Sequence, residues 1–177
     1  MEAHYRIVRR PVEEALQACG VSPSEVRLVV NCHLHFDHCG GNPAFAGTPI
    51  VSQVAELAAA GQPGYTLPEL VDFPGANYQK IDGEAELLPG VWVIPTPGHT
   101  DGHQSLVVRC TDGTVILAGQ SHDSASAYTY DQLAAQARRD GRPDPLPTYP
   151  GWIDRLAEFD PARILFAHDL AVWEPVG

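Results

Sequence analysis

The chain of 177 residues is short of positive charge and of cysteine. It has 11 lysine and arginine residues against 22 aspartate and glutamate residues, which gives a formal net charge of -11 at pH 7. Nucleic acids need a basic footprint for their phosphates, so this charge balance disfavours a nucleic acid as substrate or partner. The four cysteines match neither a C-x-x-C zinc pattern nor a disulfide scaffold, and we expect reduced thiols: Cys19, Cys32, Cys39 and Cys110.

The sequence also lacks any run of apolar residues long enough to span a membrane. No charged segment followed by an apolar leader opens the chain, so we expect no signal peptide and a cytoplasmic location. Hydrophobic residues make up 44% of the chain. This length and composition predict one domain, residues 1–177, with a substantial core.

The densest group of metal-capable side chains is an H-x-H-x-D-H motif, formed by His33, His35, Asp37 and His38. The apolar run Val26–Val30 precedes it and predicts a buried strand. Side chains two residues apart share a strand face, so His33 and His35 can point at one ion. Asp37 and His38 lie past the strand end and can turn toward a second ion. Imidazole and carboxylate are ligands of zinc and similar cations, which makes the alternative of a metal-free surface histidine cluster less favoured.

Two further histidines follow apolar strands. Val91–Ile94 leads into the segment P-T-P-G-H-T-D-G-H, which contains His99, and Arg163–Ala167 is followed by His168. Loops after such strands gather at one edge of a sheet, where sites are often built. We therefore expect His99 and His168 to lie near the H-x-H-x-D-H motif.

These three motifs together resemble those of the metallo-β-lactamase-fold hydrolases, and more closely the acyl-homoserine lactonase-type branch. The resemblance runs from about Val26 to about Trp173. It implies an α/β fold, a metallo-β-lactamase-like αββα sandwich. It also implies one or two Zn²⁺ ions per chain, or another divalent metal, in two sites. The implied ligands are His33, His35 and His99 for the first metal, and Asp37, His38 and His168 for the second.

One departure from the family concerns the residue that bridges the two metals. Family members carry an aspartate there, whereas this chain has Gln120. A neutral amide offers one usable oxygen and no charge, so we expect the second ion to be weakened most. Asp123 or His122 could substitute as a ligand. Asp123 also stands where the lactonase branch tends to carry a tyrosine. Tyr128 or Tyr130 could supply that hydroxyl, or either could be a packed loop residue.

A second departure concerns the start of the chain. Family members open with several strands before the helix that precedes the metal motif, whereas here the predicted helix Pro11–Gly20 comes almost first. Only His4–Val8 offers a short strand before it. We therefore expect the fold to lack some N-terminal strands and to leave a sheet edge exposed, which favours a homodimer. The alternative is that the start is misjudged or the sequence is a fragment.

Hydrophobic periodicity and turn residues predict the remaining elements. The segment Gly61–Gly75 is rich in glycine, proline and apolar residues and is our candidate for one wall of a substrate pocket. Thr111-Asp112-Gly113 predicts a hairpin turn. The other expected strands are Pro49–Ser52, Tyr78–Ile81, Gln104–Cys110 and Thr114–Ala118, and the expected helices are Val54–Ala60, Asp131–Arg139 and Trp152–Phe159.

Three residues beside the expected ligands have possible supporting roles. Asp101 and Asp169 could accept hydrogen bonds from ligand histidines, or could instead cap a following turn. His103 belongs to the motif that the family shares without being one of its ligands. We predict that it orients the site or is structural.

The function that this pattern favours is metal-assisted hydrolysis. A divalent ion lowers the pKa of its water from about 15.7 toward about 7, and the resulting hydroxide can attack a lactone or ester carbonyl. We expect Asp37 to be catalytic by orienting that hydroxide. The resemblance implies a quorum-quenching activity on acyl-homoserine lactones as small-molecule substrates.

Two other functions stay open. A thioesterase of the glyoxalase II type would carry a further helical segment after His168, where this sequence has only residues 169–177. A degenerate, non-catalytic domain that binds metal weakly or acts through association is favoured by Gln120 and by the missing N-terminal strands. The retention of five histidines and Asp37 counts against it.

Overall fold

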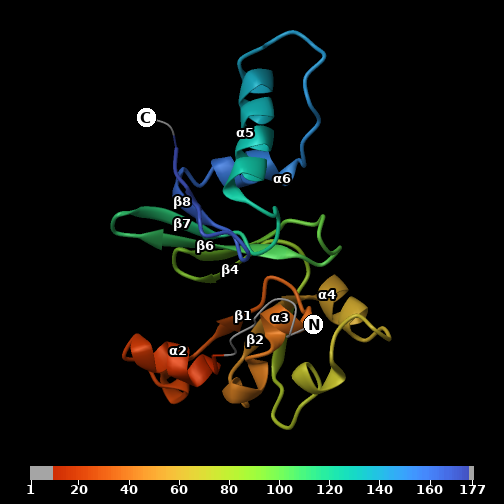
Figure 1. Cartoon of the computed structure of the whole chain (residues 1–177), viewed down its shortest axis with the longest axis vertical. Helices are drawn as coiled ribbons and strands as arrows, with labels where there is room; N and C mark the ends of the chain where they lie inside the picture. The colour runs from red at the N-terminus through yellow and green to blue at the C-terminus, as the bar shows by residue number, and fades with distance from the viewer. Residues whose placement is uncertain (1–9, 176–177) are drawn as a thin grey trace.

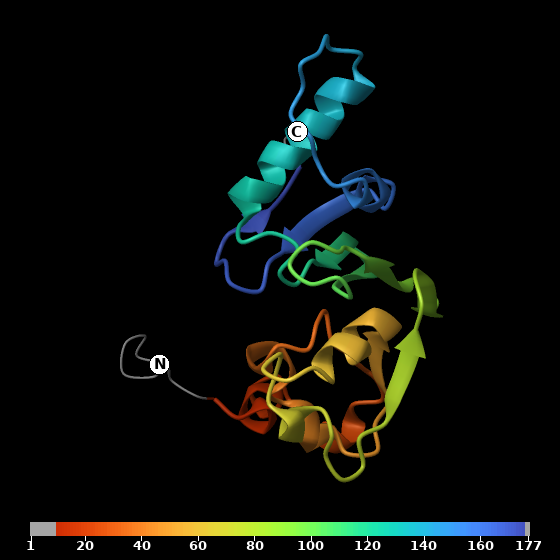
Figure 2. The same ribbon diagram turned by 90° about the vertical axis from the view of Figure 1, so that its right-hand side faces the viewer.

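The computed structural model describes residues 10–175, which form two β-sheets with helices around them (Figure 1). The expected strand His4–Val8 lies outside the described residues. One sheet has three strands and the other has six. Helices α5 and α6 lie on the side of the six-stranded sheet that faces away from the three-stranded sheet, as Figure 2 shows. Two sheets with helices on their outer faces form the layers of an αββα sandwich.

The three-stranded sheet is entirely parallel, in the order β1-β2-β3. Its central strand, β2 (Ile50–Gln53), is fully buried between β1 (Val29–Val30) and β3 (Tyr78–Ile81). The prediction of a buried strand over 26–30 is wrong in length, because β2 pairs with β1 only through Ile50 and Val51. Both residues of β1 are half-buried rather than buried.

The six-stranded sheet runs in the order β4-β5-β6-β7-β8-β9. The predicted hairpin at Asp112-Gly113 is confirmed, with Cys110 paired to Gly113 in antiparallel strands. β7 and β8 are parallel, since the helices α5 and α6 connect them. The sequence patterns missed β4 and β9. The strands are β4 (Ala85–Leu88), β5 (Val91–Pro95), β6 (Gln104–Cys110), β7 (Gly113–Leu117), β8 (Pro161–Leu165) and β9 (Val172–Trp173).

Three helices lie where they were expected, α3 was not predicted, and α5 begins earlier than predicted. It begins at Ala125 rather than Asp131, because the Ser124 side chain accepts a hydrogen bond from the Ala127 N–H at 3.2 Å. The Asp169 carboxylate also accepts the Ala125 N–H at 2.8 Å. Together these bonds satisfy two of the free N–H groups at the helix start. The helices are α2 (Val12–Ala18), α3 (Phe36–Cys39), α4 (Val54–Ala60), α5 (Ala125–Arg139) and α6 (Trp152–Ala157), with 3-10 turns η1 (Pro23–Glu25), η2 (Asn42–Phe45) and η3 (Pro68–Leu70).

The main core lies between the six-stranded sheet and the helices α5 and α6. Each fully buried aliphatic or aromatic side chain there contributes about 1.5–3 kcal/mol. The core side chains include Ile94, Val107, Ile116, Tyr128, Ile153, Leu156, Ile164 and Phe166.

Among residues 10–175, no helix is long and apolar enough to cross a membrane.

Candidate metal centre

Six metal-capable side chains from three separate chain segments form two neighbouring groups. One group is His33, His35 and His99, and the other is Asp37, His38 and His168. Within each group, one donor atom per residue lies within 4.8 Å of the others. The structure thus brings together the six residues in the two groups expected from the sequence. Their role as ligands stays a prediction.

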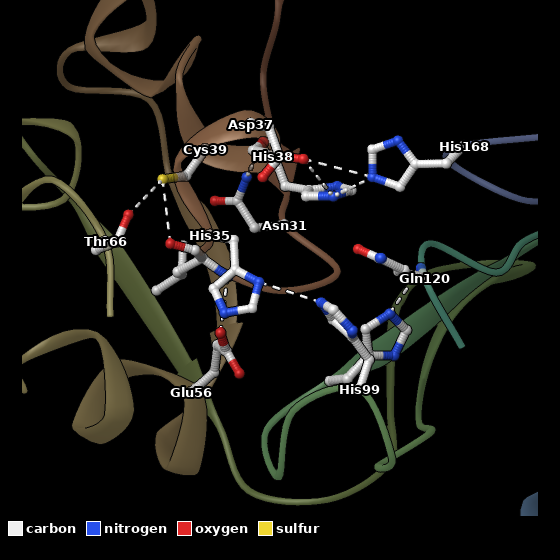
Figure 3. Close-up of polar contacts among 12 residues, drawn as sticks. Asn31, His35, Asp37, His38, Cys39, Glu56, Thr66, His99, Gln120 and His168 are labelled. Atoms are coloured by element: carbon white, nitrogen blue, oxygen red, sulfur yellow. Dashed lines mark hydrogen bonds and ion pairs between the residues drawn. The ribbon is translucent and has the colours of Figure 1, made fainter. Parts of the chain in front are cut away.

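The first group lies between the start of α3 and the loop after β5. His35 Nδ1 is 3.1 Å from His99 Nε2, the contact drawn as a dashed line between the two rings in Figure 3. The expectation that His33 and His35 share a strand face is wrong. β1 ends at Val30, and both histidines lie in the irregular segment that follows it. Their rings still meet edge to face, with centroids 4.7 Å apart.

His33 is the most informative member of this group. It is fully buried, and neither ring nitrogen has a hydrogen-bond partner in the described part of the chain. An unsatisfied buried polar group costs about 1–3 kcal/mol. Burial and the neighbouring histidines, His38 foremost, lower the pKa of His33 to about 2, which keeps the ring neutral. A neutral imidazole with no protein partner is the form that binds a cation, so the residues present fit a metal.

The second group lies between α3 and the loop after β8, which carries His168. His38 Nε2 is 3.1 Å from His168 Nε2, and Asp37 Oδ2 is 3.4 Å from His168 Nε2 and 3.5 Å from His38 Nε2. A tetrahedral site with zinc–nitrogen distances of about 2.1 Å holds its donor atoms about 3.4 Å apart. The separations in both groups therefore suit a small divalent cation.

Gln120 follows β7 through a turn at Gly119, whose φ is +58°. Figure 3 shows its side chain between His99 and His168, and therefore between the two groups. Burial lowers the pKa of His38, and the nearby Asp37 carboxylate and Gln120 amide oppose that shift. The position of Gln120 agrees with the expected bridge, while its role as a ligand stays a prediction.

The two residues considered as substitute ligands belong to neither group. His122 Nε2 is 3.2 Å from Asp131 Oδ2, and its ring packs edge-on against Tyr128 and Trp152. Asp123 is exposed, although its charge is near enough to raise the pKa of His99 against burial and the His35 charge. His122 is therefore better explained by packing than by metal binding.

The two tyrosines considered as substrate contacts are placed differently from each other. Tyr128 is fully buried in the core against Trp173 and Phe166, which matches the packed alternative. Burial raises its pKa to about 12. Tyr130 is 61% exposed on α5.

His103 supports the segment that carries Gln120. Its Nε2 accepts the Gln120 backbone N–H at 3.0 Å, so the ring proton is on Nδ1, which lies 3.1 Å from the Thr96 carbonyl oxygen. Burial lowers the pKa of His103 to about 4. This contact agrees with the orienting or structural role predicted for His103. Asp169 contacts the backbone of Ala125 and Ala171 and so takes the capping alternative.

Sequence reasoning missed Glu56, which is fully buried beside the first group. Its carboxylate accepts hydrogen bonds from the Leu34 N–H at 2.7 Å, the Thr100 hydroxyl at 2.7 Å and the Tyr65 hydroxyl. The Tyr65 ring lies 4.7 Å from that of His35, so the loop 61–75 does reach the site. The only signal in the sequence was a single carboxylate in the alanine-rich segment 54–60.

Two cavities differ in their relation to the histidines. One of about 250 Å³ is lined by His38, Cys32 and Gly119, together with residues of β7 and β8. Another of about 760 Å³ lies between α5, α6 and β9 and is lined by none of the six grouped residues. The smaller cavity is therefore the one that adjoins the candidate metal centre.

The fold is that of one known family. The model of the metallo-beta-lactamase superfamily matches residues 5–168, so the chain belongs to this superfamily. The fold expected from the sequence is thereby confirmed.

The relatives within the superfamily include several lactonases. Over 103 residues the chain is 45% identical to an N-acyl homoserine lactonase of a Bacillus species. The matched residues make up 58% of this chain and 41% of the relative. Over 174 residues the chain is 30% identical to N-acyl homoserine lactonase AttM of Rhizobium johnstonii. That match covers 90% of this chain and 64% of the relative.

Solved structures give the same picture. An N-acyl homoserine lactone hydrolase with N-hexanoyl-L-homoserine bound at its catalytic metal center superimposes with a TM-score of 0.65 at 32% identity. A Bacillus thuringiensis AiiA variant with bound N-decanoyl-L-homoserine has the same TM-score at 31% identity. Each match covers 90% of this chain and 62% of the other. The chain therefore spans less than two thirds of the length of these relatives.

Proposed function

We propose that this chain carries the metal centre of a hydrolase that opens the lactone ring of N-acyl homoserine lactones. The single observation behind the proposal is the pair of adjacent donor groups, one containing the buried and unpartnered His33. Relatives named as N-acyl homoserine lactonases support the choice of substrate class.

Each residue of the site has a proposed role in hydrolysis. A bound divalent cation supplies a Lewis acid for the carbonyl oxygen and acidifies a water molecule near pH 7. His33, His35 and His99 would hold the first cation, and Asp37, His38 and His168 the second. The Asp37 carboxylate is partly exposed at the edge of its group, where it can accept a proton from the attacking water and orient it. Tyr65 walls the side of the site next to His35.

Zinc is our proposal for the metal, because three imidazoles in a compact group suit its tetrahedral preference. Gln120 brings no charge between the groups, so two cations would repel each other more than across a carboxylate. We propose that the first group binds zinc more tightly than the second, with one or two ions per chain.

A substrate panel tests the proposed reaction. The zinc-loaded protein should release acid from an N-hexanoyl homoserine lactone faster than from a phenyl ester or an acyl-glutathione thioester. A preference for the thioester would favour the glyoxalase II type of activity instead. Zinc binding without turnover of any of the three would favour the non-catalytic alternative that Gln120 suggests.

We also propose that two copies associate and that the protein works in the cytoplasm. Apolar side chains exposed on neighbouring strands β7, β8 and β9 support association. Cys19 and Cys110 are exposed free thiols, which suits a reducing compartment.

A further inference from the structure

A buried carboxylate lies next to the first donor group and has no positively charged side-chain partner among the described residues. Glu56 is fully buried at the start of α4. Among the ion pairs of residues 10–175, none involves Glu56. Burying an isolated charge in this way costs several kcal/mol unless another charge or enough hydrogen bonds compensate it.

The hydrogen bonds around Glu56 suit an ionised carboxylate. All three partners are donors: the backbone N–H of Leu34 and the hydroxyls of Thr100 and Tyr65. A backbone N–H can only donate, and an ionised carboxylate is a pure acceptor. The arrangement therefore fits a negatively charged carboxylate held by three donors.

The three donors also connect Glu56 to the first donor group and to no member of the second. Leu34 lies between His33 and His35 in the chain, and Thr100 follows His99. Figure 3 shows Glu56 beside His35 and far from His168 in that view.

The start of α4 and the loop after β5 are packed too closely for a side chain at Gly102. A Cβ placed on Gly102 would lie 2.2 Å from the Glu56 backbone nitrogen. The loop that carries His99 is thus packed directly against the start of α4. A displacement of the Glu56 backbone would therefore act on this loop.

We propose that Glu56 is a positioning residue that fixes the loops of His33, His35 and His99 and supplies the counter-charge for a cation held there. The proposal rests on the metal site of the proposed function. It goes further by assigning the compensating charge to one residue and to one of the two donor groups.

The variant Glu56→Gln separates the charge from the hydrogen bonds. A glutamine can accept from Leu34 and Tyr65 with its oxygen and donate to the Thr100 hydroxyl, which can also act as an acceptor. Without metal, this variant should melt no lower than the unchanged protein, because the buried charge is gone. Its zinc affinity at the first group should fall about 10- to 100-fold.

The affinity of each group is measured by chelator competition in a background that lacks the other group. His168→Ala isolates the first group and His99→Ala isolates the second. Glu56→Gln should weaken zinc binding only in the His168→Ala background. A cobalt(II) absorption spectrum that changes with Glu56→Gln in that background alone gives an independent readout. Glu86→Gln, the same change at an exposed carboxylate on β4, is the control and should alter neither affinity.

Several results would overturn the proposal. They are unchanged affinity at the first group, equal weakening of both groups, and a lower melting temperature of the metal-free variant, which would indicate a purely structural role. Zinc binding by the unchanged protein with any of these results would leave the proposed function standing. A failure of the unchanged protein to bind metal would contradict both.

Discussion

The side chain at position 120 determines how much charge lies between the two donor groups. Gln120 lies between His99 and His168, where its amide adds an oxygen but no charge. Two dications a few ångströms apart repel strongly in a partly buried site. The absence of a carboxylate there should therefore affect metal occupancy more than the positions of the ligands.

Replacing Gln120 by aspartate should restore that charge. We expect Gln120→Asp to bind the second metal at least about tenfold more tightly, because a full charge faces both sites. Lactone hydrolysis should rise with occupancy. Gln120→Asn, which has the length of aspartate without its charge, is the control. Metal content after desalting measures the effect, and unchanged occupancy in the aspartate variant would show that position 120 is not at the bridge.

His103 should make the stability of the metal-free protein depend on pH. Its folded pKa is about 4 against an ordinary 6.5, because of burial, so the folded state stays neutral where the unfolded chain takes up a proton. The stability is complete above pH 6.5 and is lost as the pH falls toward 4, at about 1.4 kcal/mol per pH unit for this group. His33 acts with the same sign.

Urea unfolding between pH 7 and pH 4.5 tests this expectation. A His103→Gln variant should show a shallower dependence, by about one proton. A free energy of unfolding that stays flat over this range in the unchanged protein would contradict the account.

At the scale of elements, the sequence predicted those features that nearby residues determine. The hairpin at Asp112-Gly113 and the helix α4 were found because turn residues and periodicity specify them directly. The length of β1 was wrong, because it depends on how far β2 pairs with it. The start of α5 was wrong as well, because part of its cap comes from Asp169, 44 residues away.

The same reasoning explains which site residues could be predicted. The six grouped residues follow strands in recognisable motifs, so their convergence could be expected. Glu56 could not be found in this way. Its partners Leu34 and Thr100 are 22 and 44 residues away, and nothing in the local pattern indicates them.

A glycine pair tests the packing between α4 and the loop after β5. A Cβ at Gly102 would overlap the Glu56 backbone, so Gly102→Ala should destabilise the protein by about 1–3 kcal/mol. Gly151 has a helical φ of -60° and nothing within 4 Å of its Cβ position, so Gly151→Ala should be nearly neutral. The measurement is urea unfolding of both variants, and equal stabilities would refute this packing.

At the scale of the whole molecule, the six-stranded sheet leaves a row of apolar side chains exposed. Leu117 pairs with Leu165 across β7 and β8, and Leu165 pairs with Val172 across β8 and β9. They are 40%, 37% and 46% exposed. Directly paired residues lie on one face of a sheet, so the three side chains form one patch. The expectation of a single domain over residues 1–177 stays a prediction.

A charge in this patch should prevent self-association. We expect Leu165→Glu to shift the protein from dimer to monomer in sedimentation velocity, because a carboxylate would have to be buried at the contact. Leu88→Glu, at an exposed leucine on the edge strand β4, is the matched control and should leave the dimer intact. A monomer in the unchanged protein at all concentrations would contradict the proposed homodimer.

We propose that the two donor groups make this chain a metal-dependent lactonase. The most direct test is the rate of ring opening of an N-hexanoyl homoserine lactone as zinc is added to the metal-free protein. We predict a rate that rises with zinc and levels off at one or two equivalents per chain, and no rise in His99→Ala. Zinc that binds in these amounts without any ring opening, or ring opening that is equal in His99→Ala, would contradict the account.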